Sequence, residues 1–219
     1  MIFNALFPSK CVLCHKLLED NETDMCHSCR ATAPIVRNSK RKVPNIAQTA
    51  SVWYYKEDVR SSIHRFKFNN ARFYANIYAR FLAMKLLETD FLDKIDVITW
   101  APVSLKRRFK RGYDQGQLLA TALGKELKLP VARLLRKKRH TAAQSELKDA
   151  AARRANVQGA YIPSDPKQTK NQTVLLIDDV LTTGSTASEC SLVLHTAGAK
   201  DVYLATVALT EHEKSNKHR

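Results

Sequence analysis

The sequence has no run of apolar residues long enough to cross a membrane. No window approaches 18 consecutive apolar residues, and the apolar start at residues 1–7 has no basic region before it and ends at Pro8. We therefore expect a soluble, cytoplasmic protein. Glycine is also scarce, because the chain contains only six. They include no G-x-G and no Walker A pattern, which argues against a dinucleotide fingerprint and against nucleotide triphosphate hydrolysis.

Acidic residues are few compared with basic ones. The 36 Lys and Arg against 21 Asp and Glu give a net charge of +15. Residues 104–154 alone carry 15 Lys and Arg against 4 acidic residues, a local charge of +11. Such an excess attracts phosphorylated metabolites, nucleic acid or an anionic membrane surface, and charge alone does not choose among them. The alternative is a solvated basic face that keeps the protein soluble.

Length and patterning predict one main domain with a small module attached. We expect a metal-binding module over residues 1–36, a polar linker over 37–50, the main domain over 51–210 and a tail over 211–219. The predicted strands are residues 51–55, 96–100, 174–177 and 202–207. The predicted helices are residues 57–68, 72–87, 117–127 and 186–196. Strands that alternate with helices indicate an α/β fold with a parallel sheet.

The second of these helices is predicted from apolar residues at helical spacing. They are Phe73, Ile77, Phe81, Met84 and Leu87.

Four of the five cysteines form two C-x2-C pairs within 19 residues. They are Cys11, Cys14, Cys26 and Cys29. Two such pairs predict a closed, four-thiolate zinc site, which stabilises folding and does no catalysis. His15 and His27 adjoin these cysteines, and we expect them to be exposed neighbours rather than ligands. Cys190 stands alone on a predicted helix, where a small buried apolar residue is a better interpretation than a nucleophile.

The segment after residues 174–177 carries the main chemical signal. An apolar strand delivers Asp178 and Asp179 to the carboxyl edge of the sheet, where ligands bind in open α/β folds. The turn that follows enters a helix and offers backbone N–H groups and hydroxyls to an anion. Its residues are Thr182, Thr183, Gly184, Ser185 and Thr186. Two carboxylates beside a phosphate would repel it, unless the ligand also brings hydroxyl donors, as a ribose phosphate does.

Residues 176–186 resemble the phosphoribosyl pyrophosphate (PRPP) signature of type I phosphoribosyltransferases. Further motifs occur in the order typical of the ComF family, whose members are phosphoribosyltransferase-like proteins with a zinc ribbon, associated with DNA uptake competence. These motifs lie at residues 5–8, 11–14, 66–68, 101–103, 111–115, 141–144 and 153–157. The sequence departs from the family at Asp114, where Asn is usual, at His15, where Gly is common, and at Ala33, where Leu is usual.

The resemblance implies a type I phosphoribosyltransferase-like sheet with flanking helices and an N-terminal zinc module. It implies that Asp178 and Asp179 are the catalytic pair and bind the ribose hydroxyls together with Mg²⁺, while residues 182–186 bind the 5′-phosphate. Residues after the strand at 96–100, most of them basic, would bind pyrophosphate. The candidates are Ser104, Lys106, Arg107 and Arg111. Lys67 is equally consistent with a ligand contact and with a lysine whose charged end only reaches solvent.

Three functions fit these residues. The first is a competence protein that binds PRPP or a related ribose phosphate and handles incoming single-stranded DNA, with a helicase at the inner membrane as the kind of partner that the family implies. The second is an active phosphoribosyltransferase that moves the phosphoribosyl group to a base or amine and releases pyrophosphate. The sequence identifies no acceptor site or general base for it. The third is a PRPP-sensing regulator without turnover.

Overall fold

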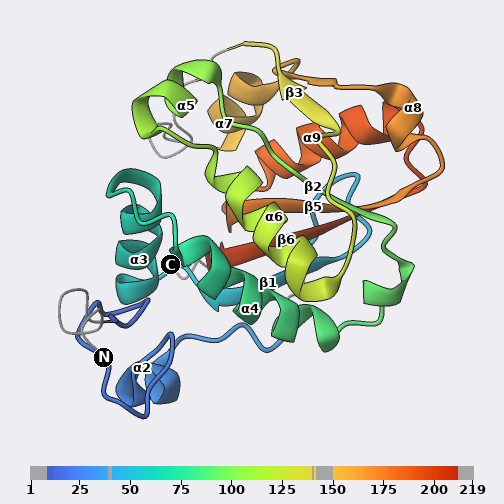
Figure 1. Ribbon diagram of the computed structural model, residues 1–219. Coiled ribbons are helices and arrows are strands. Elements are labelled where there is room, and N and C mark those ends of the chain that lie inside the picture. Colours follow the sequence, from blue (N-terminus) through green and yellow to red (C-terminus); the bar gives the residue numbers. More distant parts are fainter. Residues whose placement is uncertain (1–8, 39–40, 140, 142–149, 212–219) are drawn as a thin grey trace, which may run out of the picture.

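A four-stranded parallel sheet forms the centre of the main domain (Figure 1). The computed structural model describes residues 9–38, 41–139, 141 and 150–211, so the motif at residues 5–8, Gln144 and nearly all of the expected tail lie outside the described residues. The strand order is β1-β6-β5-β2, and all three pairings are parallel, which confirms the predicted α/β class. The four strands are β1 (Thr49–Tyr54), β2 (Val97–Trp100), β5 (Thr173–Leu181) and β6 (Asp201–Leu209).

Helices cover both faces of this sheet. Helices α4 and α6 pack on one face, and α9 packs on the other (Figure 1). The longer helices are α3 (Glu57–Phe68), α4 (Tyr74–Leu87), α6 (Gln115–Leu127), α7 (Ala150–Val157) and α9 (Ser185–Thr196). The shorter ones are α2 (His27–Thr32), η1 (Leu92–Lys94), α5 (Leu105–Arg111) and α8 (Pro166–Thr169). In the part of the chain that the structure describes, no helix is long and apolar enough to span a membrane.

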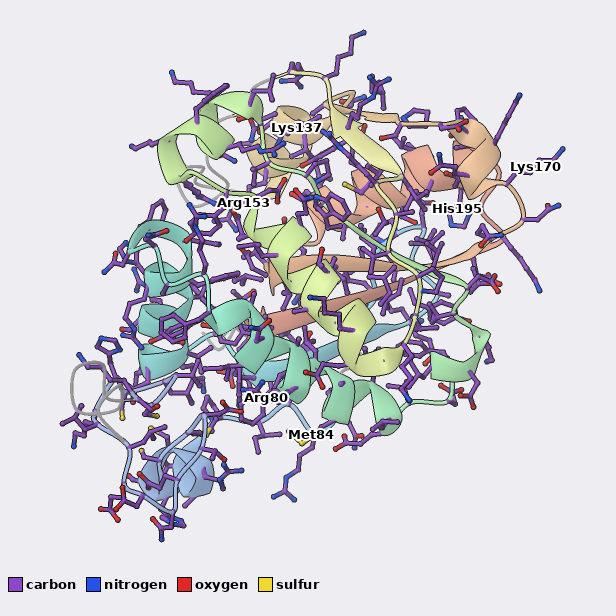
Figure 2. The ribbon with its side chains drawn as sticks, viewed as in Figure 1. Arg80, Met84, Lys137, Arg153, Lys170 and His195 are labelled. Carbon is purple, nitrogen blue, oxygen red and sulfur yellow. The ribbon has the colours of Figure 1, made fainter. Side chains whose placement is uncertain are left out.

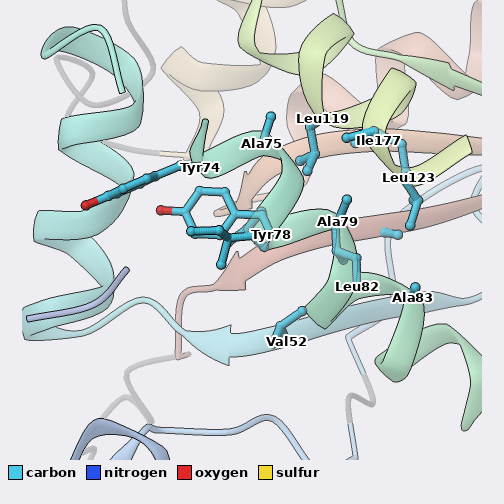
Figure 3. Close-up of a cluster of buried hydrophobic side chains, with 14 of the residues drawn as sticks. Val52, Tyr74, Ala75, Tyr78, Ala79, Leu82, Ala83, Leu119, Leu123 and Ile177 are labelled. Carbon is cyan, nitrogen blue, oxygen red and sulfur yellow. The ribbon is translucent and has the colours of Figure 1, made fainter. Parts of the chain in front are cut away.

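Two buried clusters hold these layers together. The cluster between the sheet and α4 and α6 includes Tyr78, Leu82 and Leu123 (Figure 3). The cluster on the α9 side includes Leu176 and Leu194. Because helices cover both faces, the central strands are apolar along nearly their whole length rather than alternating.

Helix α4 is confirmed, but most of the apolar residues that predict it do not form its buried face. Phe73, Met84 and Leu87 are 56%, 52% and 71% exposed, and Ile77 is buried. The buried face instead consists largely of alanine and tyrosine with two leucines (Figure 3). Its members are Tyr74, Ala75, Ile77, Tyr78, Ala79, Leu82, Ala83 and Leu86. Small side chains allow helices to approach each other and the sheet closely, so alanine rather than phenylalanine lies between α4 and α6.

The cysteine-rich segment packs directly on the main domain. Val12 and Leu13 are at most 1% exposed and belong to the same buried cluster as the α4 and α6 side chains. Arg65 of α3 donates to the carbonyls of both residues. Asp24 forms an ion pair with Arg80 of α4. The module and the main domain therefore share one core.

The segment expected as a linker lies along α9 and the turn before it. Val43 is buried, and Arg41 donates to the carbonyl of Thr182. The carbonyl of Asn45 accepts from Ser191 on α9. These contacts fix the outer side of the turn at residues 182–184.

Candidate functional site

A cavity of about 1040 Å³ opens at the carboxyl ends of β5 and β6. In Figure 1 these strand ends point toward α3, with α5 above it. Helices α3 and α5, the β3–β4 ribbon and α7 supply the walls. The lining of the cavity thus combines the two aspartates of β5 with several cations. The lining cations include Arg60, Arg65, Lys67, Arg107, Arg111, Lys137 and Arg153.

The two aspartates are part of a strand rather than of a loop, which corrects the expected strand end at residue 177. Strand β5 continues through Leu181 because its pairing with β6 continues as far as Leu181 opposite Leu209. Asp178 lies opposite Thr206 of β6. The sheet itself thus fixes the positions of both carboxylates.

The surroundings of the two carboxylates differ. Oδ2 of Asp179 is 2.9 Å from Nζ of Lys67 and 3.4 Å from Nε2 of Gln115, so its charge is compensated. Asp178 accepts the Asp179 N–H at 2.9 Å. Burial and the neighbouring Asp179 carboxylate raise the pKa of Asp178 to about 7. Asp178 therefore takes up a proton near neutral pH unless a bound cation or a hydroxyl donor stabilises its charged form.

The turn between β5 and α9 brings together all five residues predicted to hold a phosphate, and all five line the cavity. Gly184 has a φ of +81° and is the N-cap residue of α9. Because glycine has no side chain, it makes no capping hydrogen bond to the first N–H groups of the helix. Oγ1 of Thr183 lies 2.8 Å from Oγ of Ser185. Backbone donors at a helix N-terminus, with hydroxyls beside them, can bind an anion.

The four pyrophosphate candidates separate into two groups. Arg107 and Arg111 of α5 line the cavity, and Ser104 and Lys106 are not among its lining residues. Ser104 is buried and is the N-cap of α5, where its Oγ accepts from the Arg107 N–H at 3.4 Å. Lys106 is exposed. The structure thus brings two of the four side chains to the site.

Asp114 fixes the turn after β2. One of its carboxylate oxygens accepts from the Val103 N–H at 3.2 Å, and the other accepts from Gly116 and Gln117 at 3.1 and 3.3 Å. The side chain therefore caps α6 and holds Val103 at the cavity wall at the same time. A carboxylate supplies the acceptors that this turn needs, so the departure from the family's usual Asn leaves the turn intact.

Sequence reasoning missed the contribution of a short antiparallel ribbon, β3 (Leu135–Lys137) and β4 (Tyr161–Pro163). Nζ of Lys137, a residue labelled in Figure 2, lies 3.1 Å from the Tyr161 hydroxyl and 4.8 Å from the centre of its ring. Burial, with Arg107 nearby, lowers the pKa of Lys137 to about 8. Three-residue strands in a basic segment give no periodic pattern. Gln115, by contrast, lies inside a motif that was visible in the sequence.

The four paired cysteines form a separate cluster. Their sulfurs lie within 4.8 Å of one another, and those of Cys14 and Cys26 are 3.7 Å apart. A tetrahedral ion with Zn–S bonds of about 2.3 Å requires sulfur–sulfur distances of about 3.8 Å, so the cluster can hold a metal ion such as zinc. Burial raises the pKa of Cys29, whereas at Cys11 backbone hydrogen bonds outweigh burial and lower the pKa to about 7.

The remaining histidine and cysteine predictions concern side chains outside this cluster. Nδ1 of His15 lies 3.1 Å from the hydroxyl of Tyr74, so His15 contacts α4. His27 is exposed. Cys190 is fully buried on α9, and burial raises the pKa of its thiol, as expected for a packing residue.

Comparison with known proteins gives matches over most of the chain. Residues 114–219 match the phosphoribosyl transferase domain family. "Competence protein F" of Haemophilus influenzae is 29% identical over 75% of this chain and 74% of that protein. "DNA utilization protein YhgH" of Salmonella typhimurium is 30% identical over 74% of this chain and 72% of that protein. Among solved structures, a glutamine PRPP amidotransferase from B. subtilis superposes with a TM-score of 0.43 and 18% identity, over 65% of this chain and 30% of that one.

Proposed function

Because the chain belongs to the ComF family of phosphoribosyltransferase-like competence proteins, we propose that its cavity binds PRPP or a related ribose phosphate and that the protein handles single-stranded DNA during DNA uptake. The observation that carries the proposal is that one cavity combines the aspartate pair, the turn at residues 182–186 and several cations. The ribose hydroxyls would donate to Asp178 and Asp179, and the 5′-phosphate would bind at the turn.

Arg107 and Arg111 would form the pyrophosphate end of the site. Both lie on α5 and line the cavity. Bidentate guanidinium contacts suit phosphate oxygens, and Mg²⁺ bound with the ligand would neutralise part of its charge. Lys67 pairs with Asp179 in the structure, so ligand hydroxyls would compete with Lys67 for that carboxylate. The cysteine module would hold structural zinc.

The test is calorimetry of PRPP with Mg²⁺ on the zinc-loaded protein. We expect Asp178→Asn/Asp179→Asn to lower the affinity at least about tenfold, equivalent to about 1.4 kcal/mol. Arg107→Ala and Lys106→Ala are a matched pair, because they remove the same charge from adjacent positions and only Arg107 lines the cavity. Arg107→Ala should weaken PRPP but not ribose 5-phosphate, and Lys106→Ala should change neither. A folded wild type that binds neither ligand contradicts the proposal.

Transfer of the phosphoribosyl group is the second candidate function. Asp178, whose pKa is raised to about 7, and the half-buried Lys137, whose pKa is lowered to about 8, favour it, because groups that titrate near neutral pH can exchange protons with a substrate. Pyrophosphate release from PRPP that depends on an added base or amine would support transfer. Tight binding without any such release would leave a binding or sensing role.

Contact with single-stranded DNA would come from the basic residues between 104 and 154. Neutralised phosphates release counterions, so the logarithm of the affinity should fall with the logarithm of salt concentration by about 0.7 for each contact. Fluorescence anisotropy with a labelled strand at several salt concentrations measures this slope. A flat response would exclude the DNA part of the proposal, whatever the outcome with PRPP.

A further inference from the structure

Phe68, the last residue of α3, presents an aromatic ring to the cavity. The residue is 54% exposed and lines the cavity wall. The guanidinium carbon of Arg111 lies 4.8 Å from the centre of the ring, and the ring of His64 lies 4.7 Å away at an angle of 44°. The ring is thus held between α3 and α5 by polar, flat groups while more than half of the residue stays open to solvent.

This ring lines the same cavity as the proposed ribose end of the site. Lys67 directly precedes Phe68 and reaches Asp179 at 2.9 Å. The turn at residues 182–186 follows the aspartates along β5 and lines the same cavity. The cavity therefore contains an anion-binding turn, a pair of hydroxyl acceptors and an exposed aromatic ring. A nucleotide has the three matching parts, which are its phosphate, its sugar and its base.

We propose that Phe68 is a platform on which a nucleobase stacks, with Arg111 and His64 holding the ring in place. The proposal rests on the proposed function, because the ribose phosphate fixes where the base lies. Bases stack on aromatic side chains in a sequence-tolerant way, since every base has a π face. The guanidinium against the Phe68 ring adds a cation–π contact that orders the side chain before a ligand arrives.

The base can belong to a free nucleotide or to a single strand. Helix α5 offers a way to distinguish the two. Phe109 is 85% exposed, and none of the seven residues of α5 is buried. Phe109 lies between Arg108 and Lys110 and is not among the residues that line the cavity. A mononucleotide held in the cavity does not reach the Phe109 ring. A strand that leaves the cavity can stack a further base on this ring and place its phosphates beside Arg108 and Lys110.

The experiment measures three probes on the full-length, zinc-loaded protein. They are ribose 5-phosphate, which has no base, adenosine 5′-monophosphate, and a labelled oligothymidylate of about 12 nucleotides. Phe68→Leu keeps an apolar side chain but cannot stack. We expect it to leave ribose 5-phosphate affinity within twofold and to weaken a base-bearing probe at least about fivefold, the lower end for loss of one stacked base. Phe68→Trp should restore that affinity.

The two probes with bases identify the source. If Phe68→Leu lowers the affinity for the mononucleotide only, and Phe109→Leu leaves that affinity unchanged, the platform is assigned to free nucleotides or nucleobases. If Phe68→Leu and Phe109→Leu both lower the affinity for the oligonucleotide, the platform is assigned to a strand. If ribose 5-phosphate binds and Phe68→Leu alters neither base-bearing probe, the platform is overturned while the proposed function stands. If the wild type binds neither PRPP nor ribose 5-phosphate, the proposed function fails, and the effect of Phe68→Leu on the oligonucleotide still tests the platform. Thermal melting checks that each variant is folded.

Discussion

Asp178 and Asp179 are adjacent carboxylates with opposite effects on the stability of the ligand-free protein. Lys67 and Gln115 compensate Asp179, so this carboxylate contributes favourable contacts. The pKa of Asp178 is raised to about 7, mainly by burial, from an ordinary value of 3.8. Between these two values the folded protein binds a proton at Asp178 that the unfolded chain does not. Stability is therefore lost as pH rises through this window, and the cost is fully present above about pH 7.

Asp178→Asn should accordingly stabilise the ligand-free protein most above about pH 7, less at pH 5 and little below about pH 4, because the amide resembles the protonated carboxyl group. Chemical denaturation of both proteins at pH 5, 6, 7 and 8 measures the difference in free energy of unfolding. Asp179→Asn is the control of opposite sign, since it leaves Lys67 without its partner and should cost about 1–3 kcal/mol. A variant at Asp178 that is less stable than wild type at pH 8 would contradict this account.

Gly184 is required both by its backbone conformation and by a close contact. A Cβ at this position would lie 3.0 Å from Cγ2 of Val43, and φ is +81°. Gly159→Ala is a matched control, because φ is +64° there and no heavy atom lies within 4 Å of the added Cβ. We expect Gly159→Ala to cost about 1–2 kcal/mol from backbone strain alone. Gly184→Ala should cost more in denaturation experiments, and Val43→Ala should recover the excess in the double variant. Equal costs for the two glycines would refute the contact with Val43.

At the scale of elements, α4 shows which part of a helix the sequence can predict. Apolar spacing predicts that the helix exists, and this is confirmed. It does not identify the buried face, because close packing against α6 and the sheet selects alanine while the large Phe73 and Met84 remain outside (Figure 2 labels Met84). Hydrophobicity ranks side chains by transfer from water, whereas the contact between layers also limits their size.

Two neighbouring leucines test the orientation of α4. Leu86 is fully buried and Leu87 is 71% exposed. We expect Leu86→Ala to lower the free energy of unfolding by about 2–5 kcal/mol. Leu87→Ala should change it by less than about 0.5 kcal/mol. Because both variants remove the same atoms from the same helix, urea denaturation compares burial alone. Equal losses would show that Leu87 is covered by something else in solution.

The candidate site is only partly readable from the sequence, for a related reason. Asp178, Asp179 and the turn at residues 182–186 are adjacent along the chain, so one motif reveals them. Lys137 reaches the cavity through a three-residue strand whose partner lies 24 residues further along, and no local pattern specifies that pairing. Arg107 and Lys106 have the same local composition, and only the orientation of α5 separates them.

At the scale of the whole molecule, the cysteine-rich segment and the main domain pack as one structural unit. Cys11, Val12 and Leu13 are at most 1% exposed and lie in the cluster that also contains Phe66 of α3. Helix α3 in turn carries Lys67 and Phe68, which line the cavity. The module thus supports a cavity wall, and none of its described residues, 9–36, is among those that line the cavity.

Removal of the metal should consequently destabilise the entire chain. Structural four-thiolate sites stabilise folding directly, and without the ion the bonds that hold the two C-x2-C pairs together are lost. We expect a chelator or Cys29→Ser to shift a single cooperative thermal transition to lower temperature, with metal content measured on the same samples. Cys190→Ala is the control, because it should destabilise by loss of packing while retaining the full metal content. Two transitions, the later one at the wild-type temperature, would instead mean that the main domain folds independently of the module and that α3 keeps its position without the metal.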